Sequence, residues 1–417
     1  MDGTRFILIF ALVLIGLRWL GQLVLALKNQ AHVRANREQV PSEYRATMDA
    51  ETYAKSVAYT LAKSRFGQWE VAWDTVILVA VLLSGFLPAS HAWTVQRLGG
   101  SAWAQAAWLF GVGLVMSVPA LPFTWWEQFR LEDRFGFNTT TVPVWLLDQL
   151  KGFLLATGIG YPLLVLMLKL VVWMGPIWWV WSWVVLFSFQ LVMMVLAPIL
   201  ILPLFNKFTP LPEGTLRDRL LALGERTGFN ARTILVMDGS KRSRHSNAYF
   251  TGFGRFRKIV LFDTLITQLT EPELEAVLAH EVGHYKKGHI PKMLAWAAVS
   301  SLAALAIIGW LAGQSWFATA FGFPATVGVA PALLLFGLGS GAVTFWFTPV
   351  GNYWSRRHEF EADAYAKAAI GGSAPLLGAL RKLSEKNLSN LTPHPWFSTF
   401  YYSHPTLLER ERALLNS

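Results

Sequence analysis

Two histidines and a glutamate, His280, Glu281 and His284, lie in H-E-x-x-H spacing within the run AVLAHEVGHYKKGH, residues 276–289. If this run is helical, residues four apart lie one turn above each other, so both histidines can offer imidazole nitrogens to one metal ion. Glu281 lies about 100° around the helix from His280 and projects beside the ion, where it can take a proton from water. The spacing therefore indicates a metal-dependent hydrolase.

The surroundings of the motif decide how much weight it carries, because this spacing arises by chance in roughly one chain in a hundred of this length. Val282 and Gly283, between the two histidines, are uncharged and small. Leu274, Val277 and Leu278 precede them with the apolar spacing of a buried helix. We therefore expect a metal-binding helix packed in a protein core rather than a solvated surface helix.

The composition is that of a mainly α-helical, polytopic membrane protein. Of 417 residues, 53% are hydrophobic and only 15% are charged, against roughly 25% charged in soluble domains. The absence of cysteine excludes disulfides, thiolate ligands and a cysteine nucleophile, so any zinc must be held by histidine and carboxylate. The net charge of +10 is more typical of basic loops and anionic lipid contacts than of nucleic-acid binding, which we do not expect.

Seven apolar runs are long enough to cross a bilayer, at about residues 6–27, 71–88, 102–123, 150–174, 176–203, 293–311 and 327–350. The first run lacks the small-residue cleavage site of a secretory signal, so we expect it to be retained as a transmembrane helix. Between the runs, residues 28–70 are expected to form a helical hairpin-like loop, and 89–101 and 124–149 are expected to be loops.

The positive charges predict the orientation of these spans. Lysine and arginine are concentrated after spans one, three and five and in the carboxyl tail, which places these segments and the metal helix on the cytosolic side. The bias towards Ala, Leu and Trp without Cys favours a bacterial cytoplasmic membrane, or the endoplasmic reticulum membrane if the source is eukaryotic.

The predicted soluble part begins after the fifth span. Residues 206–290 are expected to contain a helix at 214–226, strands at 233–237, 248–253 and 258–262, and then the metal helix. The resulting division is a membrane region at 1–205, a catalytic region at 206–290, two further spans within 291–350, and a helical cytosolic part at 351–417 that completes the metal site.

The third metal ligand is expected in this tail, on a helix after the seventh span. Glu359 and Asp363 are four apart and share a helical face, so Glu359 can bind the metal while Asp363 orients a ligand imidazole. His358 and Glu361 diverge from that face and are expected to point elsewhere. His289 is expected to be a polar residue at a helix end rather than a ligand.

Six motifs resemble, in order and setting, the integral-membrane CAAX prenyl protease 1 family. They are LEDRFGFNTTT, PLFNKFTPLPEG, RHSNAYFTGFG, HEVGH, RRHEFEADAYA and YYSHPTLLER, and the resemblance covers nearly the whole chain from the second span onward. It implies a seven-helix α-barrel around an intramembrane chamber, with a gluzincin-like α+β zinc protease domain on the cytosolic side. It also implies removal of the C-terminal aaX tripeptide from prenylated CAAX substrates.

The same resemblance implies roles for residues of the matching motifs. His280, His284 and Glu359 would bind one zinc ion per chain, Glu281 would be the general base and acid, and Asp363 would hold a ligand imidazole. Asn247 and His404 match residues that hold the scissile carbonyl, although a turn asparagine and a capping histidine before Pro405 remain alternatives.

A substrate-binding segment is also expected from this resemblance. Arg410 lies in a stretch that matches a substrate-facing one. The segment upstream of the metal helix can pair with the substrate backbone if it is an edge strand, whereas an internal strand could not do so. Its residues are Asn247, Ala248, Tyr249 and Phe250.

Three other functions remain possible from the sequence. An HtpX-like quality-control protease would share the motif without requiring a prenyl group, but usually has fewer spans. An intramembrane site-2-type protease would keep its metal helix inside an apolar span, whereas Lys286 and Lys287 place this one at a membrane edge. A scaffold with structural zinc is disfavoured because such sites are usually rich in cysteine. The expected partners are a prenylated or otherwise membrane-associated peptide and the lipid bilayer, and the protein is expected to act as a monomer.

Overall fold

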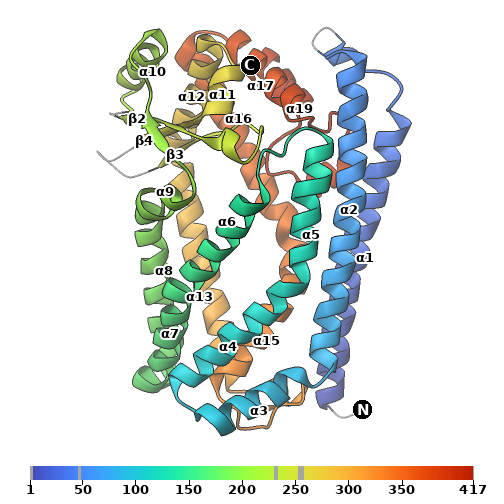
Figure 1. The fold of residues 1–417 in the computed structure, drawn as a ribbon, viewed down its shortest axis with the longest axis vertical. Coiled ribbons are helices and arrows are strands. Elements are labelled where there is room, and N and C mark those ends of the chain that lie inside the picture. Colours follow the sequence, from blue (N-terminus) through green and yellow to red (C-terminus); the bar gives the residue numbers. More distant parts are fainter. Residues whose placement is uncertain (1–2, 46–47, 230–232, 252–257, 417) are drawn as a thin grey trace.

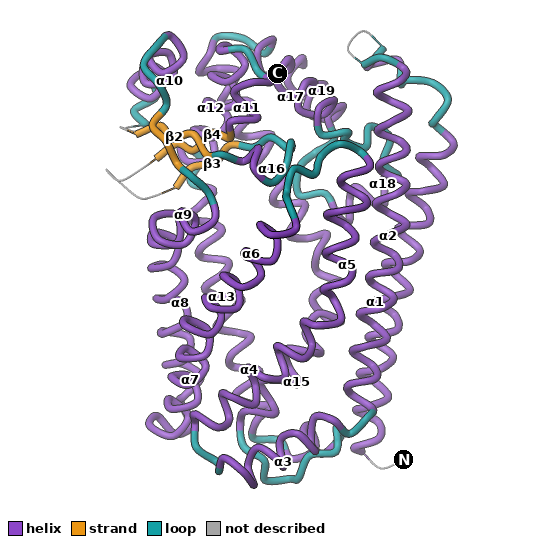
Figure 2. Tube along the Cα trace, viewed as in Figure 1, coloured by secondary structure: helices purple, strands orange, loops and turns teal. Residues whose placement is uncertain are grey.

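The computed structural model is a mainly helical membrane barrel that carries a small sheet-containing domain, here the sheet domain, at one end (Figure 1). It describes residues 3–45, 48–229, 233–251 and 258–416. The amino terminus lies at the far end of the barrel, whereas the carboxyl terminus lies beside the sheet domain. Strands occur only in that domain among the described residues (Figure 2).

The first two helices are longer than the spans predicted for them. α1 (Gly3–Ala35) and α2 (Ala50–Leu83) lie side by side, and the 33 residues of α1 extend about 50 Å, well beyond a hydrocarbon core of about 30 Å. Most of residues 28–70, predicted to be a helical hairpin-like loop, continue these two helices out of the membrane, so the predicted hairpin is helical as expected. The connection between them is limited to residues 36–49.

One face of α1 is apolar and exposed along its whole membrane part. The exposed side chains are Phe6, Phe10, Val13, Leu17, Leu20, Val24 and Leu27. They recur every three or four residues and so form one stripe along the helix. A stripe of this length facing water would be an aggregation hazard. It is instead suited to lipid hydrocarbon, as the composition predicts.

The loops predicted around the third span are also largely helical. Residues 89–101 fall mostly within α3 (Phe86–Leu98), and Ser101 caps α4 (Ala102–Ser117) by accepting a hydrogen bond from the Ala104 N–H. After α5 (Leu121–Trp126) the chain continues through a π-helical turn at Glu127–Glu132 before α6 (Val142–Leu155) begins. The predicted loop at 124–149 is thus restricted to a shorter connection before α6.

Six helical runs among the described residues are long and apolar enough to cross a membrane. One of them, Val142–Phe205, contains 64 residues and includes α7 (Tyr161–Met174), α8 (Trp178–Leu196) and α9 (Leu202–Phe205). α7 and α8 pack against each other across a turn at Gly175, whose φ of 55° suits glycine. The count of seven spans stays a prediction.

The sheet domain contains a four-stranded sheet in the order β1-β2-β4-β3. β2 (Thr233–Met237) and β4 (Lys258–Phe262) are parallel, while β1 (Phe208–Pro210) and β3 (Ala248–Thr251) pair antiparallel with them at the two edges. The predicted strands are confirmed where they are described, and residues 252 and 253 lie outside the described part of the chain. The three-residue strand β1 was not predicted.

Helices surround this sheet and return the chain to the membrane. α10 (Thr215–Arg226) confirms the predicted helix, and α11 (Asp263–Gln268) leads into α12 (Glu271–Lys286), which begins at a capping box formed by Thr270 and Glu273. α13 (His289–Ala312) is separated from α12 by two residues, Lys287 and Gly288, and runs into the barrel. α14 (Ser315–Thr319) and α15 (Val329–Thr344) follow it.

The tail returns from the barrel to the sheet domain through α16 (Thr348–Ile370). It ends with α17 (Ala374–Lys386), α18 (Pro395–Tyr401) and α19 (Leu407–Asn416). α12 contacts α16, α17 and α10 in one apolar core that includes Leu223, Leu274, Val282, Ala366 and Leu376. This core fixes the relative positions of the H-E-x-x-H helix and the tail helix.

Candidate metal centre and active site

The two histidines of the motif lie on one face of α12, as their spacing predicts. The Nε2 atoms of His280 and His284 are 3.2 Å apart. His280 is buried, and His284 is partly buried. The nitrogens opposite these atoms point away from each other, towards Asp363 and His289. Both rings therefore present the same nitrogen to a common point.

Glu359 reaches that point from α16. Its Oε1 lies 3.2 Å from Nε2 of His284, and its Oε2 lies 3.4 Å from Nε2 of His280. Ligand atoms of His280, His284 and Glu359 all lie within 4.8 Å of one another. The structure thus brings together the three residues expected from the sequence to bind metal.

The surroundings of these three residues suit a cation. Oε2 of Glu359 is buried and accepts no hydrogen bond in the described structure. Burial disfavours the charged form of His280, but interactions with Asp363 and Glu359 outweigh that effect and raise the pKa of His280 to about 9. The buried carboxylate oxygen without a hydrogen-bond donor is the feature that suits a bound cation. Two imidazole nitrogens and one carboxylate oxygen form the ligand set of a catalytic zinc site with one open position.

Asp363 holds the outer nitrogen of His280. Its Oδ1 lies 2.7 Å from Nδ1 of His280, where the carboxylate can accept a hydrogen bond from the ring. Arg410 in turn donates to both carboxylate oxygens of Asp363, at 2.8 Å from Nε and 2.6 Å from Nη2. Asp363 thus occupies the orienting position that its helical spacing predicts.

The contacts of Arg410 differ from the substrate-facing role expected for it. Only 9% of Arg410 is exposed, and its guanidinium is engaged by Asp363 and lies 3.8 Å from Glu359. Arg410 does border the active-site cavity, so contact with substrate stays a prediction. Its bidentate pairing favours a role in positioning Asp363 instead.

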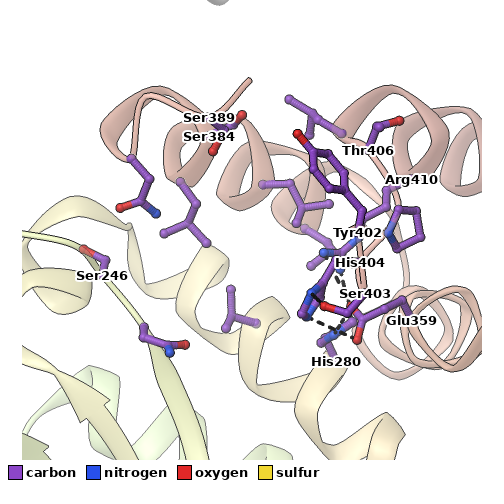
Figure 3. Close-up of a pocket in the computed structure, with 18 of the residues that line it drawn as sticks. Ser246, His280, Glu359, Ser384, Ser389, Tyr402, Ser403, His404, Thr406 and Arg410 are labelled. Atoms are coloured by element: carbon purple, nitrogen blue, oxygen red, sulfur yellow. Dashed lines mark hydrogen bonds and ion pairs between the residues drawn. The ribbon is translucent and has the colours of Figure 1, made fainter. Parts of the chain in front are cut away.

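Glu281 and His404 lie at the open side of the metal-ligand cluster. Burial raises the pKa of Glu281, which suits a general base that works near neutral pH. Nε2 of His404 lies 3.5 Å from Oε1 of Glu359, and Figure 3 shows the His404 ring directed at Glu359 and His280. His404 thus lies beside the metal-ligand cluster, where a hydrogen-bond donor to substrate would be needed.

A cavity of 670 Å³ opens above these residues. Asn247 and Ala248 of the β3 segment border it, and β3 is an edge strand, so the alternative of an internal strand is wrong. Within the described sheet, no strand pairs with the outer side of β3. The backbone of Tyr249 and Phe250 continues the same edge. This edge can accept an extended peptide by strand addition.

An apolar wall of the cavity was missed by sequence reasoning. α17 contributes Leu376, Leu380 and Leu383 to it, and Leu265 and Val277 add to the same lining. The three leucines have the i, i+4, i+7 spacing of one helical face, a pattern that could have identified them.

Two residues expected to lie apart from the site are in contact with it. His289 is the first residue of α13, as a helix-end position predicts, but it is buried and touches His284 rather than solvent. Glu361, which was expected to point elsewhere, contacts His289. Their contacts depend on how α12, α13 and α16 pack, which the spacing within each segment does not reveal.

Comparison with protein families assigns both halves of the chain. Residues 29–207 match the family described as CAAX prenyl protease N-terminal, five membrane helices. Residues 210–417 match peptidase family M48. These two matches divide the chain close to the start of the sheet.

Individual relatives match over almost the full length. CAAX prenyl protease 1 of Saccharomyces cerevisiae is 35% identical over 409 residues, which cover 91% of this chain and 89% of the relative. The human CAAX prenyl protease 1 homolog is 31% identical over 441 residues, covering 93% and 91%. The crystal structure of S. mikatae Ste24p superimposes with a TM-score of 0.88 at 32% identity, covering 99% of both chains. The chain therefore belongs to the CAAX prenyl protease 1 family of membrane metallopeptidases.

Proposed function

We propose that this chain is a zinc endopeptidase that removes the C-terminal aaX tripeptide from prenylated CAAX substrates at a membrane surface. The observation that carries the proposal is the convergence of His280, His284 and Glu359 within 4.8 Å at a cavity bordered by an edge strand. The helix that follows the metal helix, α13, leads directly from this site into the membrane barrel.

In this proposal the three ligands bind one zinc ion, and Glu281 handles the protons. Zinc would supply Lewis acidity that lowers the pKa of water and polarises the scissile carbonyl. Glu281 accepts a proton from the attacking water and returns it to the leaving amine, which its raised pKa favours. Asp363 keeps the ring of His280 oriented by accepting from its Nδ1.

His404 and Asn247 are the proposed donors to the carbonyl oxygen on which negative charge develops. His404 borders the cavity beside Glu359, and Asn247 borders it at the start of β3. Such a donor contributes about 3 kcal/mol to transition-state stabilisation. The substrate backbone would lie along the segment from Asn247 to Phe250 and be held by main-chain hydrogen bonds.

The membrane barrel is the proposed place for the lipid of the substrate. Each buried CH₂ group of a prenyl chain contributes about 0.8 kcal/mol, so a barrel interior or the bilayer can hold the lipid while the peptide reaches the zinc site. We place the site on the cytosolic side of a bacterial cytoplasmic membrane, from the distribution of Lys and Arg and from the composition. The protein is proposed to act as a monomer.

Membrane and peptidase regions alternate along the chain in this proposal. Residues 1–205 and 291–350 supply the membrane barrel, and residues 206–290 and 351–417 supply the two parts of the peptidase site. The quality-control alternative is not favoured, because the relatives that cover about nine-tenths of the chain carry the CAAX prenyl protease name.

The deciding experiment compares a farnesylated CAAX peptide with the same peptide lacking the lipid. Both are incubated with the purified protein and with Glu281→Ala, and the products are located by mass spectrometry. We expect zinc-dependent cleavage on the C-terminal side of the modified cysteine, faster with the lipid than without it and absent from the variant. Equal rates for the two peptides would contradict the prenyl preference and favour a general membrane endopeptidase.

A further inference from the structure

A second chain of polar contacts lies on the far side of His284 from the metal position. His289 is 1% exposed, and its Nδ1 lies 3.0 Å from Nδ1 of His284. The other ring nitrogen, Nε2, lies 3.1 Å from Oε2 of Glu361. Arg357 approaches the remaining carboxylate oxygen, with its Nε 3.3 Å from Oε1 of Glu361. The contacts run from α12 through the start of α13 to α16.

The chemistry of these groups determines which atom donates and which accepts in each hydrogen bond. A carboxylate only accepts hydrogen bonds, so Nε2 of His289 must carry the proton that it donates to Glu361. Nδ1 of a neutral His289 is then an acceptor, and it can receive the Nδ1–H of His284. With its proton on Nδ1, His284 presents the lone pair of Nε2 to the point shared with His280 and Glu359.

We propose that His289 is a positioning residue that orients the proposed zinc ligand His284. Glu361 holds His289 in the tautomer that this role requires. The inference rests on the proposed zinc site. It gives His284 the support that Asp363 gives His280, with an imidazole interposed before the carboxylate. Outer partners of this kind typically contribute about tenfold to a hundredfold to metal affinity.

The packing around His289 fixes its ring. His358 of α16 stacks on it, with ring centroids 4.0 Å apart and an interplanar angle of 13°. Because His289 is the first residue of α13, the contact also ties the metal helix to a helix that enters the membrane barrel. Among the described residues, His358 takes no part in the hydrogen bonds of His289. A substitution of His358 therefore tests the stacking contact without changing those hydrogen bonds.

The test measures zinc affinity of the purified full-length protein by competition with a chelating indicator. His289→Leu removes the acceptor, and we expect its zinc dissociation constant to rise about tenfold or more. His289→Asn places an amide oxygen near the Nδ1 position and should recover most of that loss. His358→Phe keeps an aromatic stack and should bind zinc within about twofold of the unmodified protein.

A second pair of variants tests the direction of the contacts. Glu361→Gln keeps an acceptor, whereas Glu361→Lys can only donate to His289 and would force its proton onto Nδ1, facing the Nδ1–H of His284. The lysine variant should therefore bind zinc more weakly than the glutamine variant. Its cobalt-substituted form should show an altered visible absorption spectrum, which reports ligand geometry independently of catalysis.

The outcomes separate this inference from the proposed function. Absence of zinc binding by the unmodified protein would overturn the proposed zinc site and this inference with it. Normal zinc binding by the unmodified protein, with His289→Leu within twofold of it, would overturn only the positioning role. Equal losses for His289→Leu and His289→Asn in correctly folded protein would also overturn it, because packing rather than an acceptor would then be responsible.

Discussion

Gly283 of α12 lies directly against Ala362 of α16. A Cβ atom at Gly283 would come within 2.9 Å of the Ala362 Cα and 3.0 Å of its carbonyl oxygen. The two helices therefore cross more closely than a side chain at Gly283 would allow. His280 and His284 flank Gly283, while Glu359 and Asp363 flank Ala362, so this close approach lies beside the proposed metal site.

Gly283→Ala should disturb the metal site although it removes no ligand. The added methyl group must push the helices apart, and we expect the free energy of unfolding to fall by about 1–3 kcal/mol despite the better helix propensity of alanine. Zinc affinity should fall with it, because Glu359 moves away from the histidines. Gly351→Ala in α16, where a Cβ meets open space, is the matched control and should retain zinc. Unchanged zinc affinity in Gly283→Ala would contradict this account of the crossing.

The purified protein should contain one zinc ion per chain. Substitution of His280, His284 or Glu359 by alanine should abolish stoichiometric zinc in elemental analysis, since each provides one donor of the cluster. A chelator should likewise remove zinc and peptidase activity together, and added zinc should restore both. Undiminished zinc in Glu359→Ala would mean that another residue is the third ligand, and His358 would be the first to test.

Glu281→Gln separates chemistry from metal binding. Because Glu281 is proposed as the base and not as a ligand, the variant should keep its zinc, its membrane insertion and its stability. Turnover should fall by about two to four orders of magnitude. Single-turnover cleavage and elemental analysis of the same preparation provide the measurement. Turnover close to that of the unmodified enzyme would mean that another group activates the water.

The acid side of the pH profile should report the same carboxylate. Burial raises the pKa of Glu281 above the ordinary value of 4.5. A base acts when deprotonated, so activity should be present above this pKa and lost as the pH falls through it. We expect the acid limb of kcat/KM to lie above pH 4.5. An acid limb at or below that value would contradict Glu281 as a buried base.

Arg410→Gln should act through Asp363. Removal of the guanidinium leaves a buried carboxylate without its bidentate partner, and breaking such a pair costs about 3–5 kcal/mol of stability. Zinc affinity should also fall, because Asp363 no longer holds His280 firmly. A rise in KM alone, with zinc affinity and stability unchanged, would instead support the substrate contact expected from the sequence.

The catalytic helix and the strands could be predicted because their patterns are local. H-E-x-x-H spacing and the apolar run around it specify one helical face, and the runs at 233–237 and 258–262 have the composition of buried strands. The spacing of Glu359 and Asp363 likewise places both on one face of α16. These expectations depend on neighbours within one segment.

The features that the sequence does not predict depend on contacts between segments. β1 has three residues ending in Pro210 and carries no pattern of its own, so only pairing with β2 reveals it. The burial of Arg410 follows from the packing of α19 on α16, which its own segment does not reveal. A helical hairpin at 28–70 is present as expected, but hydropathy alone does not show that α1 and α2 continue into it from the apolar runs.

The division of the ligands between α12 and α16 also sets an order of events during synthesis. His280 and His284 are made first, and α13 and α15 follow before Glu359 emerges. Because α13 and α15 lie within candidate spans, the chain must cross the membrane and return before the third ligand can meet the first two. A nascent chain that stalls before Glu359, or one in which α13 and α15 fail to insert, holds an incomplete ligand set. With the proposed ligands, we expect peptidase activity to be confined to molecules whose integration into the bilayer is finished.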